Sequence, residues 1–590
     1  NLELICSVWS NQDLSEIRHL TITTLYTAMT EWLCRRHLML QSSKIQILSK
    51  KKLYENCHKE ITFLETLAFH AMKNNTIIIQ PRLLNKIIEE TQIDSEEDYP
   101  KILKIGLLKS FDKGSTGNQL ELEKDHYFIH LSFQEYFAAR YLIHALNNSK
   151  SEEAKAFINR QKYNQRYALV FQFMSGIISE LNSQLEPSQF WNIILREPLD
   201  MVGIRHIQLV ISCMDAASDI TTVPNHSELL EWIADYIQHC ILQSSEHEIN
   251  SNQIIQYFKT AESVINHEII LQMFISLLEH SDTHINQQTL ILLGDLNVNQ
   301  LDRISSLIVN FLSHQNDFVR ISACEALGNM GEKAATNEVI EKLVSALEDK
   351  HYSVRYSACR ALGKMGEKAA TNEVIEKLVS ALGDQDDTVR GSACKALGNM
   401  SEKAATNEVI EKLVSALEDD NYKVRMSACE ALGNMGEKAA TNEVIEKLVS
   451  AVGDDYYSVR WSACRALGKM GEKAATNEVI NKLVSLLGDQ DAWVRMSACA
   501  ALGNMGEKAA TNEVIEKLVS AVGDDYYIVR INAYKALGDM GEKAATNEVI
   551  EKLVSLLGDD DYNVRYSACE ALGNMGEKAA TNEVIEKLVS

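Results

Sequence analysis

The second half of the chain is a single sequence unit copied many times. The dipeptide Val-Arg returns at a constant interval of 35 residues, with no insertion or deletion between copies. A period between about 20 and 50 residues is typical of solenoids, in which each unit buries its apolar face only against its neighbours. The repeat therefore predicts that function is spread over a long surface and not confined to one catalytic pocket. The arginines of the series are Arg320, Arg355, Arg390, Arg425, Arg460, Arg495, Arg530 and Arg565.

Each unit contains two helical patterns. Apolar residues recur at helical spacing in both, so each pattern has one stripe suited to burial. Thr336 or Asn337 is placed to cap the first helix, and Gly366 stands where the second helix should stop. We therefore predict that each unit is an antiparallel helix pair. The two stripes are Val339, Ile340, Leu343, Val344 and Leu347, and then Val354, Ala358, Ala361, Leu362 and Met365.

An aspartate stands six residues before each repeated arginine, except in the first unit, where His314 takes its place. A loop aspartate, Val-Arg and then Ala-x-x-Ala-Leu-Gly resembles HEAT repeats, particularly the bilin-lyase-like variety, from roughly Leu271 to the end. We predict that the aspartates and arginines form a ladder that joins adjacent units, with an ion site as the alternative. The ladder residues are Asp349, Arg355, Asp384, Arg390, Asp419, Arg425, Asp454 and Arg460.

The copies differ mainly in the second helix. The positions of Ser353, Tyr356, Arg360 and Lys364 vary radically between units and, at about 100° per residue, share the face opposite the apolar stripe. Neutral drift is the structural alternative, but drift seldom introduces the exposed Trp and Tyr that dominate binding hot spots. Because the resemblance to HEAT repeats implies that this helix lines the concave surface, we predict a protein ligand there. The predicted partner-binding residues are Tyr356, Arg360, Met426, Glu430, Trp461, Arg465, Trp493, Met496 and Lys535.

Composition limits the remaining choices. The chain has 590 residues, is 46% hydrophobic and contains only 5 Pro, which favours a folded, helix-rich protein. Its net charge of −24 argues against nucleic-acid partners. Cysteines recur at one repeat position, as at Cys359, and such same-face thiols suit a reducing compartment. The longest apolar stretch, at 168–178, is too short to span a bilayer, so we expect a cytoplasmic protein without membrane contact.

The first 300 residues carry a different pattern. Helical stretches surround a β-like run at 76–80 and a strand or wing at 105–111, an order that describes a winged helix. The segment His130-Leu-Ser-Phe-Gln-Glu-Tyr-Phe-Ala-Ala139, together with residues 4–9 and 31–36, resembles the carboxy-terminal part of a NACHT module. NACHT modules belong to the STAND ATPases, the class that includes NOD-like receptors of innate immunity.

This resemblance implies a nucleotide-controlled switch. It assigns to His130 a contact with the β-phosphate of ADP in the full-length protein, and it implies homo-oligomers on activation. A structural histidine at a strand end is the alternative. The chain has no Gly-x-x-x-x-Gly-Lys-[Ser/Thr] loop, so we expect no cofactor in this fragment, and ATP or ADP would belong to the parent family. We interpret the chain as part of a longer receptor.

Together these observations predict a mainly α fold with four parts. They are the helical end of a NACHT module at 1–50, a winged-helix-like domain at 51–146, a second helical domain at 147–265 and a truncated HEAT solenoid at 266–590. The favoured function is ligand sensing in a STAND-type receptor, and the alternative is a passive scaffold for protein partners. A bilin lyase or metal hydroxylase is disfavoured, because the repeats contain no His beyond His351 and the two His-Glu dipeptides, at His247 and His267, lie outside the regular array.

Overall fold

The computed structural model describes residues 21–41, 49–111, 121–180, 187–200, 203–243, 253–296, 301–558 and 562–589. The chain forms two compact units, residues 1–277 with 297–299 and residues 278–296 with 300–590. The finer division of the first 265 residues stays a prediction. Two features named in the sequence analysis, at 4–9 and 247–248, lie outside the described residues.

The first unit is helical apart from one small sheet. Its helices are α2 (Ile22–Gln41), α3 (Lys50–Asn56), α4 (His58–Lys73), α5 (Pro81–Thr91), α6 (Tyr99–Ile105), α7 (Leu131–Leu146), α8 (Ser151–Gln161), α9 (Ala168–Glu180), α10 (Pro187–Leu195), α11 (Ile204–Ala216), α12 (His226–Gln243), α13 (Gln253–Thr260), α14 (Glu262–Ile265) and α15 (Glu268–Leu278). Strands β1 (Leu108–Phe111) and β2 (Asp125–Phe128) pair antiparallel, with Leu108 opposite Phe128.

The sheet differs in detail from the sequence prediction. Only Ile79 of the β-like run at 76–80 joins it, through a single bridge to His126. Strand β1 lies within the segment predicted as a strand or wing, 105–111. Its partner β2 was not predicted: Tyr127 and Phe128 pair with β1, and the next helix begins at Leu131.

Helix α7 lies at the centre of the first unit. Its fully buried Phe133 meets the ring of Tyr26 edge to face, with centroids 4.8 Å apart. Glu65 of α4 is also buried, and its carboxylate accepts a hydrogen bond from Arg140 Nε at 2.7 Å and lies 2.8 Å from His144 Nδ1. A buried charge is tolerated when it is paired in this way, so these contacts fix α7 against α4.

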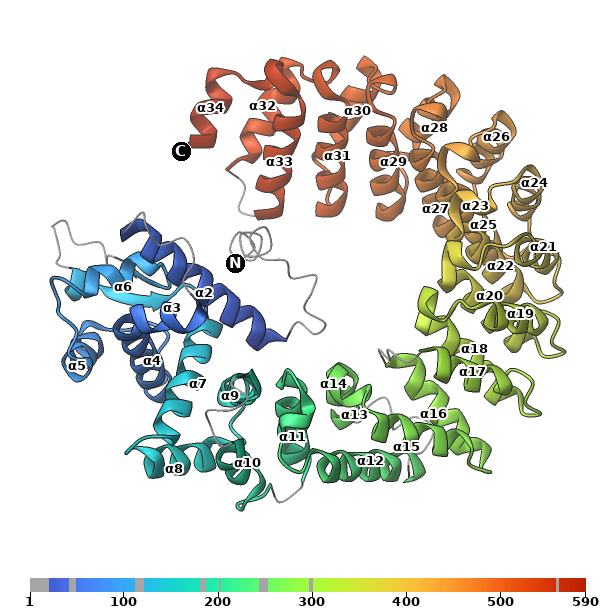
Figure 1. Ribbon diagram of the computed structural model, residues 1–590. Helices are drawn as coiled ribbons and strands as arrows, with labels where there is room; N and C mark the ends of the chain where they lie inside the picture. Colours follow the sequence, from blue (N-terminus) through green and yellow to red (C-terminus); the bar gives the residue numbers. More distant parts are fainter. Residues whose placement is uncertain are drawn as a thin grey trace. The chain divides into compact units, whose positions relative to one another are not determined.

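The second unit is a stack of helix pairs, as the repeat predicts (Figure 1). The first helices of the pairs are α17 (Leu301–Phe311), α19 (Asn337–Ala346), α21 (Asn372–Ala381), α24 (Asn407–Ala416), α26 (Asn442–Ala451), α28 (Asn477–Leu486), α30 (Asn512–Ala521), α32 (Asn547–Leu556) and α34 (Asn582–Val589). The second helices are α16 (Thr283–Asp295), α18 (Asp317–Met330), α20 (Tyr352–Met365), α22 (Asp387–Asn399), α25 (Tyr422–Asn434), α27 (Tyr457–Lys469), α29 (Ala492–Asn504), α31 (Tyr527–Asp539) and α33 (Tyr562–Asn574). The predicted mainly α fold with an α-solenoid of HEAT repeats is confirmed.

Local signals in each unit act as expected. All ten residues of the two apolar stripes in the first full unit are buried. The Thr336 side chain accepts a hydrogen bond from the Val339 amide and caps α19. Gly366 ends α20 with a φ of 56°, a left-handed conformation that glycine adopts without steric cost.

Consecutive second helices pack backbone against backbone. A Cβ atom placed on Gly363 of α20 would lie 2.9 Å from the Cα of Ala396 in α22, closer than side chains tolerate. The second helices contact one another extensively, whereas consecutive first helices contact each other only slightly. Because closer spacing on one side bends a stack toward that side, the second helices lie along the inner side of the curved stack (Figure 1).

Candidate functional site

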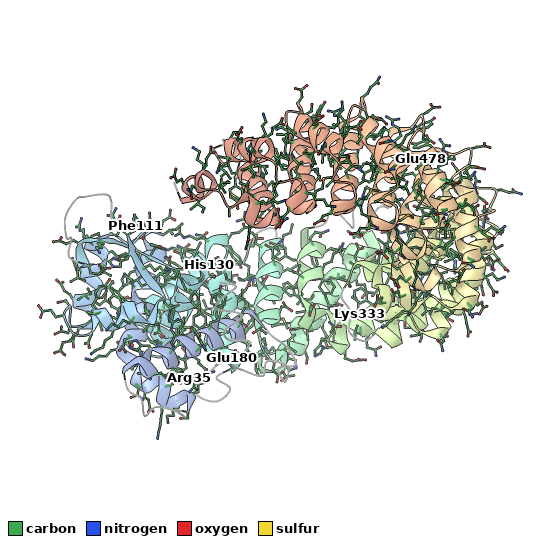
Figure 2. The ribbon with its side chains drawn as sticks, turned by 90° about the horizontal axis from the view of Figure 1, so that it is seen from above. Arg35, Phe111, His130, Glu180, Lys333 and Glu478 are labelled. Atoms are coloured by element: carbon green, nitrogen blue, oxygen red, sulfur yellow. The ribbon has the colours of Figure 1, made fainter. Side chains whose placement is uncertain are left out.

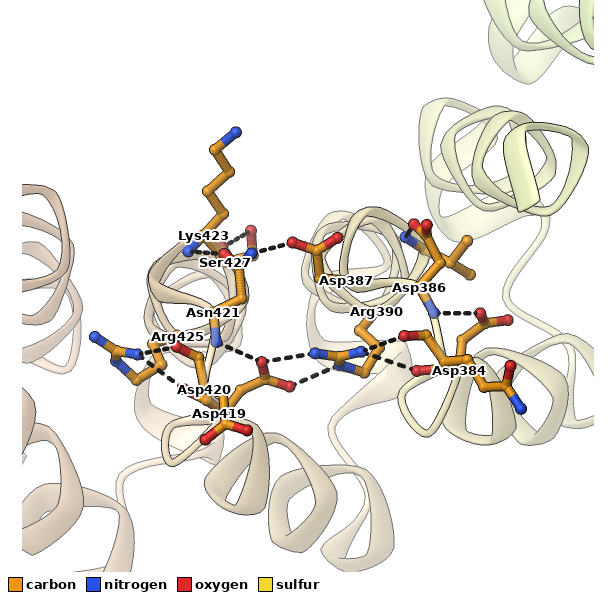
Figure 3. Close-up of polar contacts among 12 residues, drawn as sticks. Asp384, Asp386, Asp387, Arg390, Asp419, Asp420, Asn421, Lys423, Arg425 and Ser427 are labelled. Atoms are coloured by element: carbon orange, nitrogen blue, oxygen red, sulfur yellow. Dashed lines mark hydrogen bonds and ion pairs between the residues drawn. The ribbon is translucent and has the colours of Figure 1, made fainter.

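Arginine–aspartate pairs join each unit to the next along one edge of the stack. Arg390 Nε and Nη2 donate to the carboxylate of Asp419 at 2.7 and 2.8 Å (Figure 3). Its Nη1 donates to the backbone oxygens of Asp384 and Gln385 in its own loop, at 3.0 and 3.1 Å. Such bidentate, charge-assisted bonds fix geometry as well as adding energy. The same arrangement joins Arg320 to Asp349, Arg355 to Asp384, Arg425 to Asp454, Arg460 to Asp489 and Arg495 to Asp524.

The register of these pairs explains the exception in the first unit. Each of these six arginines reaches the aspartate of the following unit. From the aspartate six residues before it, Arg355, for example, uses only the backbone oxygen. Ile285 stands where the preceding arginine would lie, so the carboxylate expected at His314 would have no cation to pair with. Arg320 still receives its loop contact, because its Nη1 donates to the His314 backbone oxygen at 2.8 Å.

The ladder should make stability depend on pH. The hydrogen bond from Arg355 lowers the pKa of Asp384, although desolvation opposes it. We expect Arg355→Ala to cost about 1–2 kcal/mol at pH 7, because it leaves a partly buried carboxylate unpaired. A lowered folded pKa contributes stability that is present above the unfolded value of about 3.9 and is lost as pH falls through the folded value. The difference between variant and wild type should therefore shrink below about pH 4.

Urea unfolding of both proteins from pH 7 down to pH 2.5 measures this difference. Lys403→Ala is the matched control, since its ammonium lies 3.9 Å from Glu367 and both side chains are more than half exposed. We expect that control to change stability by less than about 0.5 kcal/mol at any pH. Equal losses for the two variants would contradict the assignment of the ladder as the main ionic support.

The nine predicted partner-binding residues all lie on second helices. Trp493, Arg360, Arg465 and Lys535 are exposed, and the other five are half-buried. Trp493 is 52% exposed, whereas the indole N–H of Trp461 is buried and has no hydrogen-bond partner. The guanidinium carbon of Arg465 lies 4.8 Å from the centre of the Trp461 ring. Their role in binding a partner stays a prediction.

Part of the charge variation on this face has a structural explanation that the sequence did not reveal. Arg360 lies 3.6 Å from Glu325 of the preceding unit, and Lys395 lies 3.9 Å from Glu430 of the following one. Lys469 similarly donates to the side-chain oxygen of Asn434 at 2.6 Å. Residues of opposite charge, or residues that can hydrogen-bond to each other, therefore stand at equivalent positions of neighbouring units because those positions contact each other.

The inner face contains a hollow of about 750 Å³ over Gly391. The equivalent position is filled by Tyr356, Met426 and Trp461 in neighbouring units, so the absent side chain opens the space. The structure brings three predicted residues, Tyr356, Arg360 and Met426, to this hollow, and it does not bring Trp493, Met496 or Lys535 there. The lining is completed by Asp387, Thr388, Gly391, Ser392, Lys395, Tyr422, Lys423, Ser427, Tyr456, Tyr457 and Ser458.

Stacked tyrosines form one wall of the hollow. The rings of Tyr422 and Tyr456 are nearly parallel, at 5°, with centroids 4.3 Å apart. The guanidinium carbon of Arg425 lies 5.8 Å from the centre of the Tyr456 ring. The sequence did not predict this stack, because its two tyrosines belong to different units.

His130 of the first unit lies at the start of α7 (Figure 2). It is exposed, and its Nδ1 accepts a hydrogen bond from the Ser132 amide at 3.3 Å, so it caps the helix. Across the described ranges, no three His, Cys, Asp or Glu side chains group as a metal site would require. The described helices also include none that is long and apolar enough to cross a membrane.

Comparison with known proteins gives a family match over the repeats. The family model of the adaptin N terminal region matches residues 220–524 and, in a second overlapping match, 367–589. Among solved structures, an engineered protein is 21% identical with a TM-score of 0.39, over 62% of this chain and 98% of its own. Kap95p, described as binding RanGDP, is 15% identical with a TM-score of 0.45, over 76% of this chain and 62% of its own. Kap121p is 14% identical with a TM-score of 0.41, over 75% of this chain and 51% of its own. A comparison with curated proteins gave no match.

The family match corrects the resemblance inferred for the first half of the chain. The predicted resemblance to NACHT modules of STAND ATPases is wrong, since the matching family is the adaptin N terminal region. The structure shows why the segment from His130 misled: His130 caps α7, while Phe133, Tyr136 and Phe137 are buried core residues. A helix that is capped at its start and buried along one face carries this pattern of residues whether or not a nucleotide binds nearby. The ADP contact of His130, the NOD-like receptor function and the oligomers on activation therefore lose their basis.

Proposed function

Because the chain belongs to the adaptin N terminal region family, we propose that it is a protein-binding scaffold that holds its partners on the inner face of the solenoid. The observation that supports this proposal is the contrast between the two helices of each unit. The first helices are nearly identical from copy to copy, whereas the inner face carries different side chains in every unit. Contacts between neighbouring copies account for part of the charge variation, as between Arg360 and Glu325, but they do not account for exposed aromatic residues such as Trp493.

Exposed aromatic residues support binding of protein in particular. Tyr457, Trp493 and Tyr527 are each more than half exposed, and all three lie at the beginning of second helices. Large exposed aromatics mark interaction surfaces, and at interfaces such residues contribute the most on truncation. The proposal assigns the chain no catalytic activity and no nucleotide switch.

Nucleic acid is the less suitable partner for this face. The chain carries a net charge of −24, and carboxylates such as Glu325 and Glu430 interrupt the basic residues along the inner helices. Phosphate backbones require a continuous basic stripe, because the release of counterions by Lys and Arg supplies most of the affinity. A protein surface of mixed charge fits the observed alternation better.

Alanine substitution of Tyr457 and Trp493 should weaken binding of a protein partner with little effect on folding. We expect each to cost about 2 kcal/mol or more in binding free energy, as interface hot spots do. Partners captured by the purified chain would be identified, produced separately and titrated by calorimetry against wild type and both variants. Thermal unfolding of the variants checks that the fold is retained.

The matched control changes the opposite side of the stack. Glu338, Glu341 and Lys342 are exposed on α19, and their combined replacement by Ala should leave affinity unchanged. If the affinity of a partner is unchanged by substitution of the inner aromatic residues but falls in this triple variant, the partner binds the outer face. Absence of any protein partner would overturn the scaffold function itself.

A further inference from the structure

The hollow over Gly391 is the most distinctive part of the inner face. It is bounded by four consecutive second helices or the loops before them, from Tyr356 of α20 to Ser458 of α27. Its volume of about 750 Å³ falls within the range of sites that hold small ligands or side chains, about 300–1,000 Å³. A Cβ atom on Gly391 would have only Ser427 Oγ at 3.6 Å and a backbone oxygen at 3.9 Å as near neighbours. Gly391 is itself buried, and a Cβ atom there would make ordinary van der Waals contacts with α25 without a clash.

The ionisable groups around the hollow are mostly cationic. Arg360, Lys395 and Lys423 line it, against one carboxylate, Asp387. The carboxylate is already engaged, because Asn421 Nδ2 donates to it, and the Lys423 side chain extends away from that pair (Figure 3). The residues that line the hollow thus carry more positive than negative charge, on a chain whose net charge is −24.

The cations are only weakly neutralised by the protein. Lys395 reaches Glu430 at 3.9 Å with its own side chain 52% exposed, and Arg360 lies 3.6 Å from a Glu325 that is 44% exposed. In the part of the chain that the structure describes, the Lys423 ammonium has no carboxylate within pairing distance. Exposed pairs at such separations contribute little, so an incoming carboxylate can replace these partners at small cost.

The apolar parts of the lining face the same space. Met426 and Tyr356 are half-buried there, and the stacked Tyr422 and Tyr456 form a rigid aromatic wall. Aromatic rings prefer offset or edge contacts with other rings, and a thioether adapts its shape to a bulky neighbour. One large apolar side chain seated over Gly391 would contact all of these groups.

We propose that the hollow over Gly391 binds an acidic peptide segment of a partner protein, with one bulky apolar side chain over Gly391 and carboxylates beside Arg360, Lys395 and Lys423. This rests on the proposed scaffold function and names the class of partner that the scaffold takes at this place. We choose an acidic peptide because its carboxylates complement the charges of Arg360, Lys395 and Lys423. Single-stranded RNA shares the need for cations and aromatic rings, but its phosphate backbone would have to continue past Glu325 and Glu430.

The decisive variant is Gly391→Met, which copies the residue that two other units carry at this position, Met426 and Met496. It occupies the part of the hollow directly over Gly391, and methionine is a better helix former than glycine, so the melting temperature should not fall. Gly391→Ala is the matched control, because a methyl group has ordinary contacts there and leaves most of the space open. Lys395→Gln combined with Lys423→Gln removes two charges and keeps the hollow.

Binding is measured by fluorescence polarisation on the whole chain with labelled nonapeptides and an oligonucleotide. The peptides are an Asp/Glu-rich sequence with a central Phe, the same sequence with a central Ala, and a Lys/Arg-rich sequence with a central Phe; the oligonucleotide is octauridylate. We expect the acidic Phe peptide to bind at least about tenfold more tightly than the other three, with an affinity that falls as salt rises. Gly391→Met and the double Gln variant should each weaken it at least about tenfold, and Gly391→Ala should change it less than about twofold.

Equal affinity for the acidic and basic peptides, or unchanged binding to Gly391→Met, overturns the proposal. Tighter binding of octauridylate than of any peptide overturns it in favour of RNA. The affinity of a captured protein partner distinguishes this proposal from the scaffold function. If that affinity falls on substitution of Tyr457 and Trp493 but is unchanged by Gly391→Met, the scaffold function stands and the assignment of this hollow fails.

Discussion

Leu362→Ala is expected to lower the free energy of unfolding by about 2–5 kcal/mol, because it removes a fully buried side chain and leaves a cavity. Leu362 lies on α20 in the apolar stripe, opposite the variable face. In a solenoid each unit contacts only its neighbours, so the loss should act locally. We expect α20 and the adjoining second helices, α18 and α22, to lose protection first.

Native-state hydrogen exchange measures this order of opening. Amides of α18, α20 and α22 should exchange faster in the variant, while those of α29 and α31 should change little. Lys364→Ala is the control on the same helix, since Lys364 is exposed and its replacement should change stability by less than about 0.5 kcal/mol. A uniform loss of protection from α18 to α33 would show that the array unfolds as one cooperative block.

The sequence predicted the solenoid well because its signals are local and repeated. Each of these signals depends on residues within one unit, and the signals recur along the array. They are the repeat period, the helix cap at Thr336, the helix end at Gly366 and the apolar stripe that contains Leu362. The contacts that the sequence missed join different units. The sequence predicted a ladder between units but not its register, in which Arg355 pairs with Asp384 of the following unit. The stack of Tyr422 on Tyr456 and the hollow over Gly391 were missed, because both require the spacing between helices, which no single unit contains.

The first half of the chain shows the opposite case. Its pattern occurs once, so no second copy could test an interpretation of the segment that begins at His130. Buried aromatics and a helix cap are common requirements of packed helices, and they produced a resemblance without the corresponding family. The strand at Tyr127 was missed for a related reason, since its partner β1 is a separate segment of the sequence, at 108–111.

Gly433→Ala should destabilise the chain by about 3 kcal/mol, at the upper end of the range for overpacking, although alanine is the better helix former by about 1 kcal/mol. The added Cβ would lie 2.8 Å from the Cα of Ala466 in α27, and a backbone atom in a packed helix cannot give way as a flexible side chain does. The clash would force α25 and α27 apart, and with them the bond from Arg425 to Asp454.

Substitutions at two other glycines serve as controls, because they show the effect of replacing glycine by alanine where no such clash occurs. Gly391 lies inside α22, where an added Cβ atom would make only ordinary contacts, 3.6 Å from Ser427 Oγ and 3.9 Å from a backbone oxygen, so Gly391→Ala should raise stability by up to about 1 kcal/mol. Gly436 also has nothing within 4 Å but adopts a φ of 58°, so Gly436→Ala should cost about 1 kcal/mol through the backbone alone. Urea unfolding of the three variants compares them directly. If Gly433→Ala instead stabilises the chain as much as Gly391→Ala does, close approach of the second helices is not what sets the curvature of the stack.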